Sequence, residues 1–215
     1  MASIAVIDYG MGNLRSVAKA LEHVALPGQR VIITQRAADI EAADRVVLPG
    51  QSAIRDAMAE LQRLQLVAVI KRAAAEKPFF GMCLGPQALL EWSEENGGVA
   101  CLGVLPGRVQ RFPAELRDTL SGERLKIPHM GWTPVHQTRA HELWRDIPQD
   151  SRFYFVHSYY LKPAEEALIA GETEYGLRFA SAIAHDYIFA VQFHPEKSAQ
   201  AGLQLLANFC RWQPR

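Results

Sequence analysis

The chain has 215 residues, 49% of them apolar, which suffices for one large domain with a substantial core. Its 23 basic and 23 acidic residues balance, so nothing in the charge suggests electrostatic binding to nucleic acid or to an anionic membrane. No apolar stretch is long enough to cross a bilayer, and three scattered cysteines are too few for a disulfide framework or a Cys-x-x-Cys zinc pair.

The first half of the chain alternates short apolar runs with helical patterns. The N-terminus carries no basic-then-apolar signal segment, so together with the cysteine content we expect a reduced, cytoplasmic protein. Apolar runs predict buried strands at 4–8, 31–34, 46–48 and 79–82. Apolar residues at helical spacing predict helices over 14–24, 57–70 and 84–92. Strands that alternate with helices predict an α/β fold, with an open, mostly parallel sheet and helices on both faces.

After Gly98 most predicted strands are joined by turns rather than helices, so this half should add antiparallel strands. These strands are predicted at 104–112, 153–160, 168–170, 182–184 and 188–193. A final helix is expected over 199–212, and the polar stretch 115–126 should form an exposed loop. No repeat or flexible linker divides the chain, so residues 1–215 are expected to form a single domain.

Cys83 has the sequence context of a nucleophile. It follows the strand 79–82 directly and stands between Gly81 and Gly85, the glycine spacing of a sharp strand-to-helix turn that exposes a reactive side chain. Backbone N–H groups at the start of the next helix, near Leu84, would favour a thiolate and could hold an oxyanion. The alternative is a small buried cysteine, the commoner fate of a lone cysteine.

His194 and Glu196 supply a base and an orienting carboxylate. Pro195 biases His194 toward extended backbone, in which residues two apart point the same way, so Glu196 should reach the imidazole. Such a carboxylate fixes the tautomer and stabilises the imidazolium. The alternative is a surface His-Pro-Glu turn.

Other positions carry weaker signals. The turn Pro49-Gly50 follows strand 46–48 at the same sheet edge, so N–H groups near Gly50 could complete the oxyanion hole. No histidine has metal-ligand spacing with a partner, and neither metal nor cofactor is expected. Four histidines are interpreted as surface or packing residues, namely His23, His136, His141 and His185. His129 and His157 are interpreted as structural or interfacial.

The segments 81–87 (Gly-Met-Cys-Leu-Gly-Pro-Gln) and 193–198 (Phe-His-Pro-Glu-Lys-Ser) resemble the class I triad glutamine amidotransferases, which have a flavodoxin-like sheet. Among these amidotransferases, the chain most resembles the glutaminase subunits of imidazole glycerol phosphate synthase. That resemblance lies in segments 8–14, 106–108, 127–132 and 154–160, which occur in the same order along the chain. The resemblance implies that Cys83 attacks the glutamine side-chain amide, with His194 moving protons and Glu196 orienting it. It also implies that Gln87 helps to hold glutamine and that backbone at Ser158 and Tyr159 holds its amino-acid end.

Four residues depart from that family pattern. Pro86 replaces a methionine, Gln51-Ser52 replaces Val-Gly after Pro49-Gly50, and Thr133 replaces an asparagine. Proline is tolerated in a first helical turn, so its effect should be mild. Loss of the second glycine could change how the turn presents an N–H group to the oxyanion.

The resemblance implies a heterodimer with a cyclase subunit, a (β/α)8 barrel that uses the ammonia in histidine biosynthesis. Free ammonia is mostly protonated at neutral pH, which also favours a partner that receives it directly. Hypothesised contacts with this partner are Asn13, Met130, Trp132 and Lys197; ordinary core packing is the alternative for Met130 and Trp132. Two other functions stay open: a glutaminase subunit for anthranilate, aminobenzoate or guanylate synthesis, and a catalytically silent regulatory relative.

Overall fold

One half of the central sheet is parallel, as predicted. The computed structural model describes residues 2–214. Neighbouring strands run in the order β2 (Arg30–Thr34), β1 (Ser3–Ile7), β3 (Arg45–Leu48), β4 (Phe79–Met82) and β14 (Ile188–Val191), each parallel to the next. Strands β3, β4 and β14 are buried along their whole length, which fits a parallel sheet covered on both faces.

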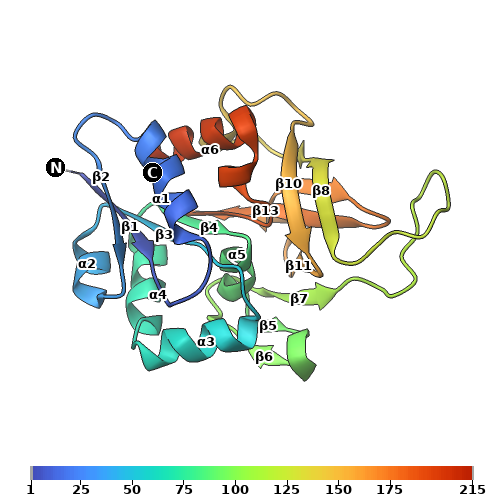
Figure 1. Cartoon of the computed structure of the whole chain (residues 1–215), viewed down its shortest axis with the longest axis horizontal. Coiled ribbons are helices and arrows are strands. Elements are labelled where there is room, and N and C mark those ends of the chain that lie inside the picture. Colours follow the sequence, from blue (N-terminus) through green and yellow to red (C-terminus); the bar gives the residue numbers. More distant parts are fainter. Residues whose placement is uncertain (1, 215) are drawn as a thin grey trace.

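Helices cover both faces of this sheet (Figure 1). Alternate residues of β1 enter different cores: Ala5 and Ile7 pack in one cluster, Ile4 and Val6 in the other. The first cluster includes residues of α2 (Ala37–Ala42), α3 (Ile54–Arg63), α4 (Val67–Glu76) and α5 (Leu84–Leu89). The second includes residues of α1 (Leu14–Val24) and α6 (Ala199–Arg211), which lie together in Figure 1.

The other half of the sheet is largely antiparallel. From β14 it continues through β13 (Arg178–His185), β11 (Tyr159–Pro163) and β7 (Gly107–Arg111) to the short strands β5 (Trp92–Ser93) and β6 (Val99–Ala100). Among the described strands of this half, β5 and β7 are the one pair that runs parallel. β12 (Ile169–Glu174) pairs with β13 and with β9 (His136–Gln137). A separate antiparallel pair joins β8 (His129–Pro134) to β10 (Arg152–His157). Short 3-10 helices occur at Glu95–Gly97, Glu142–Trp144, Glu166–Leu168 and Pro195–Lys197.

Several local predictions need correction. The helix expected over 57–70 is two helices, because the backbone at Gln65 takes a left-handed conformation with φ 57° and ends the first. The helix after Cys83 ends at Leu89, and Trp92 enters β5 instead. The strand expected over 153–160 is interrupted at Ser158, where the chain passes from β10 to β11 and so from one sheet to the other.

Helix α2, strand β8 and the short strands β6 and β9 were not predicted, whereas the exposed loop over 115–126 was. The stretch 115–126 protrudes from the molecule (Figure 1) and is closed at its tip by Asp118, whose carboxylate accepts the N–H groups of Leu120 and Ser121. An isolated bridge between Arg117 and Arg124 joins its two sides. The loop leaves β7 and returns directly before β8.

Candidate active site

The strand-to-helix turn holds Cys83 in a strained conformation. Cys83 follows β4 and precedes α5, with φ 54° and ψ −90°, a backbone conformation that non-glycine residues rarely adopt. A Cβ atom at Gly81 would lie 2.8 Å from the Cβ of Ala190, and one at Gly85 would collide with the backbone oxygen of Leu48. Both glycines are therefore required because β14 and β3 approach the turn too closely for a side chain.

His194 and Glu196 form a buried pair. Nδ1 of His194 lies 2.9 Å from Oε1 of Glu196, and the two side chains are only 2% and 1% exposed. A carboxylate accepts only, so Nδ1 carries the proton and Nε2 is left for Cys83 or the substrate. Glu196 reaches the imidazole from a 3-10 turn, Pro195–Lys197, and not from the extended chain that we expected. Ser198 Oγ closes this turn by donating to the carbonyl oxygen of His194 at 2.6 Å.

The electrostatics of His194 favour the imidazolium. Burial acts against the charged ring, but interactions with Cys83 and then with Glu196 outweigh it and raise the pKa of His194 to about 9. Nε2 of His194 is buried and has no hydrogen-bond partner of ordinary geometry among residues 2–214, and the same holds for Oε2 of Glu196. An imidazolium beside a cysteine stabilises the thiolate, the reactive form of the nucleophile.

Cys83 and His194 open onto a cavity of about 410 Å³, the size range of small-ligand sites. The cavity brings together Cys83, His194 and four of the five positions predicted to bind the substrate or its oxyanion, namely Leu84, Gln87, Ser158 and Tyr159. Segments about 110 residues apart therefore meet, because β14, which leads to His194, lies beside β4, which leads to Cys83. Gly50 borders a smaller neighbouring cavity together with Asn13, Cys83, His194 and Glu196.

The oxyanion turn differs from the expectation. We predicted N–H groups of Leu84 and of the residue near Gly50 facing the reacting oxygen. Instead the carbonyl oxygen of Gly50 faces the N–H of Leu84 at 3.5 Å, so the turn 49–51 presents an acceptor there. The hydroxyl of Tyr9 donates to the Pro49 carbonyl at 2.8 Å, and Nε2 of Gln51 lies 3.3 Å from Nδ1 of His194. Assembly of an oxyanion hole at this position requires that the turn reorients.

Gln87 is part of a buried polar network that sequence reasoning missed. Its amide group donates to the Gln192 side-chain oxygen at 3.0 Å and to the Tyr159 carbonyl at 3.4 Å. Gln192 in turn donates to the carbonyl of Cys83 at 3.1 Å. A glutamine inside the apolar run 188–193 was the available signal for Gln192.

Pro86 lies in the first turn of α5, where a missing N–H costs no intrahelical bond.

The four hypothesised partner contacts differ in exposure. Met130 and Trp132 are 61% and 46% exposed, so neither is a core residue. Lys197 is exposed beside Glu196. The Asn13 side chain caps α1 by accepting the N–H of Ser16 at 3.3 Å, and therefore has a structural role of its own.

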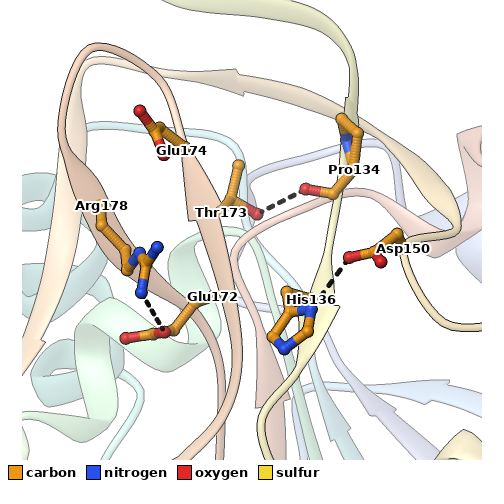
Figure 2. A pocket seen from close by; sticks show the side chains of 7 residues that line it. All are labelled: Pro134, His136, Asp150, Glu172, Thr173, Glu174 and Arg178. Atoms are coloured by element: carbon orange, nitrogen blue, oxygen red, sulfur yellow. Dashed lines mark hydrogen bonds and ion pairs between the residues drawn. The ribbon is translucent and has the colours of Figure 1, made fainter. Parts of the chain in front are cut away.

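A second hollow, which no triad residue lines, has no comparable chemistry. Figure 2 shows it beside β9 and β12, where His136 pairs with Asp150 at 3.0 Å and Arg178 lies 3.9 Å from Glu172. Four of its polar side chains thus form two pairs, Glu174 lies outside both, and no cysteine lines the hollow. Among residues 2–214, no three His, Cys, Asp or Glu side chains are placed to hold a metal ion. None of the described helices has the length and apolar character needed to cross a membrane.

Comparisons with known proteins agree with this geometry. The family model "Glutamine amidotransferase class-I" matches residues 5–212. The chain is 63% identical to imidazole glycerol phosphate synthase subunit HisH of Nitrosococcus oceani, over 99% of this chain and 98% of that protein. It is 59% identical to the protein of the same name from Aromatoleum aromaticum, with both chains covered completely.

Solved structures show the same fold at low sequence identity. A putative GMP synthase subunit from Thermoplasma acidophilum superposes with a TM-score of 0.71 at 19% identity, over 98% of this chain and 93% of that one. PurLQS from Thermotoga maritima gives a TM-score of 0.71 at 14% identity, over 98% of each chain. These likenesses confirm the predicted fold class, and the relatives confirm the predicted family. The chain belongs to the class I glutamine amidotransferases, in the family of imidazole glycerol phosphate synthase subunit HisH.

Proposed function

We propose that this chain hydrolyses the side-chain amide of L-glutamine to glutamate and ammonia, and that a cyclase subunit receives the ammonia. The observation that carries the residue assignment is the buried His194–Glu196 pair at 2.9 Å, next to a strained Cys83. Relatives at 54–63% identity carry the name of imidazole glycerol phosphate synthase subunit HisH, which favours this synthase over anthranilate, aminobenzoate or guanylate synthesis. The product would serve histidine biosynthesis.

The first chemical step forms a thioester. The Cys83 thiolate attacks the side-chain carbonyl carbon of glutamine, and the carbonyl electrons move to oxygen. The imidazolium of His194 then gives its Nε2 proton to the amide nitrogen, the C–N bond breaks, and ammonia leaves. Glu196 accepts the Nδ1–H throughout, so the ring keeps one tautomer and Nε2 stays the reacting nitrogen.

The second step regenerates the enzyme. Neutral His194 takes a proton from water as the water oxygen attacks the thioester carbonyl, and the C–S bond breaks to release glutamate. The thiolate and the imidazolium are restored together. Leu84, Gln87, Ser158 and Tyr159 line the cavity in which this substrate would lie. In this proposal backbone at Ser158 and Tyr159 holds the amino-acid end of glutamine and Gln87 supports that segment.

The turn 49–51 is closed in the sense that its Gly50 carbonyl occupies the Leu84 N–H group, and this supports low basal activity. With the Gly50 carbonyl facing the Leu84 N–H, an oxyanion placed there would meet a second acceptor rather than two donors. Binding of the cyclase subunit, with its own ligand, would favour the reoriented turn. The exposed side chains of Met130, Trp132 and Lys197 are proposed contacts in this heterodimer, with Asn13 at the neighbouring cavity.

A glutaminase assay tests the proposal. Glutamate formation should be slow for the isolated chain, rise on addition of the cyclase subunit with its nucleotide ligand, and disappear in Cys83→Ala. Brisk hydrolysis by the isolated chain would contradict the role of the closed turn. No hydrolysis by the complete complex would favour a catalytically silent relative.

The free thiols of Cys83, Cys101 and Cys210 fit the reduced, cytoplasmic setting that we propose.

A further inference from the structure

A line of hydrogen bonds runs from β8 to the backbone of the substrate cavity. The hydroxyl of Thr133 lies 2.7 Å from Nε2 of His129, and Nδ1 of His129 lies 2.9 Å from Nε2 of His157. Nδ1 of His157 lies 2.7 Å from the carbonyl oxygen of Tyr159. The triad uses none of these three side chains, so their arrangement needs its own explanation.

The register of the small sheet explains how the residues meet. His129 of β8 pairs directly with His157 of β10, and both rings lie on the buried face, 1% and 6% exposed. Thr133 and His129 are four residues apart and share this face, whereas Met130 and Trp132 point the other way. The His129 ring also stacks on Phe155 and on Tyr175, with centroids 4.8 and 4.0 Å apart. The imidazole therefore has a fixed orientation.

The positions of the protons follow from the last acceptor. A carbonyl oxygen can only accept, so Nδ1 of His157 carries a proton and donates it to Tyr159. Nε2 of neutral His157 is then an acceptor, which requires a proton on Nδ1 of His129. Nε2 of His129 is an acceptor in turn, and the Thr133 hydroxyl donates to it. All three bonds point toward Tyr159.

Both rings are neutral in this order. Burial lowers the pKa of His129 to about 4. Burial, and then the proximity of His129, lower the pKa of His157 to about 3. Neutral rings also avoid placing a second positive charge near the His194 imidazolium.

The Tyr159 carbonyl is a shared acceptor. It also receives a bond from Gln87, whose amide donates to Gln192, and Gln192 donates to the carbonyl of Cys83. One continuous network thus joins β8, the segment 158–159 and the nucleophile turn. We propose that Thr133, His129 and His157 are positioning residues for glutamine, which fix the Ser158–Tyr159 segment from behind through the Tyr159 carbonyl. This role rests on the proposed glutaminase function.

The proton order is tested directly by nitrogen-15 NMR of the histidine rings at pH 7. We expect His129 and His157 both to show a protonated Nδ1 and an unprotonated Nε2. An Nε2–H tautomer or an imidazolium at either ring would overturn the proposed order. This readout uses the wild-type protein and does not depend on its activity.

Matched variants test the role in binding, measured in the complex with the cyclase subunit. A contact to the amino-acid end of glutamine, away from the amide that reacts, stabilises bound glutamine and transition state alike, so its loss raises KM and leaves kcat nearly unchanged. Thr133→Val should raise KM about threefold and His157→Leu about tenfold, with kcat within about twofold. Thr133→Ser keeps the hydroxyl, and His157→Asn keeps a donor near the Nδ1 position, so both should restore much of the affinity.

The two proposals fail in different ways. If the wild-type complex does not hydrolyse glutamine, the proposed function is wrong, whatever the ring tautomers. If it hydrolyses glutamine and KM is the same in Thr133→Val and His157→Leu, the positioning role is wrong. The positioning role would also be contradicted if KM for glutamine rose equally in His157→Leu and His157→Asn while iodoacetamide labelling of Cys83 stayed unchanged.

Discussion

Replacing Glu196 by glutamine tests the electrostatic account of the site most sharply. The carboxylate lies 2.9 Å from Nδ1 of His194 in a buried pair, so Glu196→Gln removes a charge and keeps the shape. A hydrogen bond to a charged group contributes about 1.5–3 kcal/mol, which corresponds to about one to two pKa units. Because Glu196 raises the pKa of His194, its loss should lower that pKa from about 9 to roughly 7–8.

The catalytic loss should exceed this electrostatic loss. A glutamine amide can also donate to Nδ1 and place the ring proton on Nε2, the wrong tautomer for accepting a proton there. We therefore expect kcat/KM for glutamine hydrolysis in the complex to fall about 10²- to 10⁴-fold. Nitrogen-15 NMR titration of His194 gives the pKa, and a coupled glutamate assay gives the rate.

The matched control is Asp150→Asn. Its carboxylate lies 3.0 Å from Nδ1 of His136, a pair of the same kind that is exposed and lines a hollow (Figure 2) to which no triad residue contributes. An exposed pair contributes at most about 1 kcal/mol, so this variant should leave activity unchanged. The reasoning is refuted if Glu196→Gln keeps kcat/KM within about threefold of wild type, or if its His194 pKa remains about 9.

Three further outcomes follow from the same geometry. Hydrolysis should decline as pH rises through about 9, because His194 then loses the proton that it gives to leaving ammonia; a flat profile to higher pH would contradict this. Gln51→Val removes a side-chain amide that packs 3.3 Å from Nδ1 of His194, and its loss should free the turn and raise hydrolysis by the isolated chain about two- to tenfold; an unchanged or lower rate would count against that role. Gly85→Ala should lower the free energy of unfolding by about 1–3 kcal/mol in urea titration, since its Cβ would collide with the Leu48 backbone; an unchanged midpoint would show that the turn can relax.

The nucleophile turn was predictable because its chemistry is local. A buried strand, a cysteine and two flanking glycines fix the position of Cys83 from adjacent residues alone. The His194–Glu196 contact is also local, although the backbone that makes it is a 3-10 turn. Parallel strands β1, β3 and β4 are continuous apolar runs and were found within one residue at each end.

The missed features depend on tertiary contacts. Strand β8 has His129, Gly131 and Thr133 on its buried face, so it lacks the apolar alternation that predicts a strand. Its inner polar groups are satisfied by His157, which lies 28 residues away. The roles of Tyr9 and Gln51 likewise depend on contacts across 40 and 143 residues, which no local pattern contains.

The central claim is that Cys83 is the nucleophile that attacks glutamine. The most direct measurement is labelling of the complex with a chloroketone analogue of glutamine, followed by peptide mapping by mass spectrometry. We predict a single label on Cys83, slowed by added glutamine, with no label on the half-buried thiol of Cys101 or on buried Cys210. Absence of label at Cys83, or labelling that glutamine does not slow, would contradict the account.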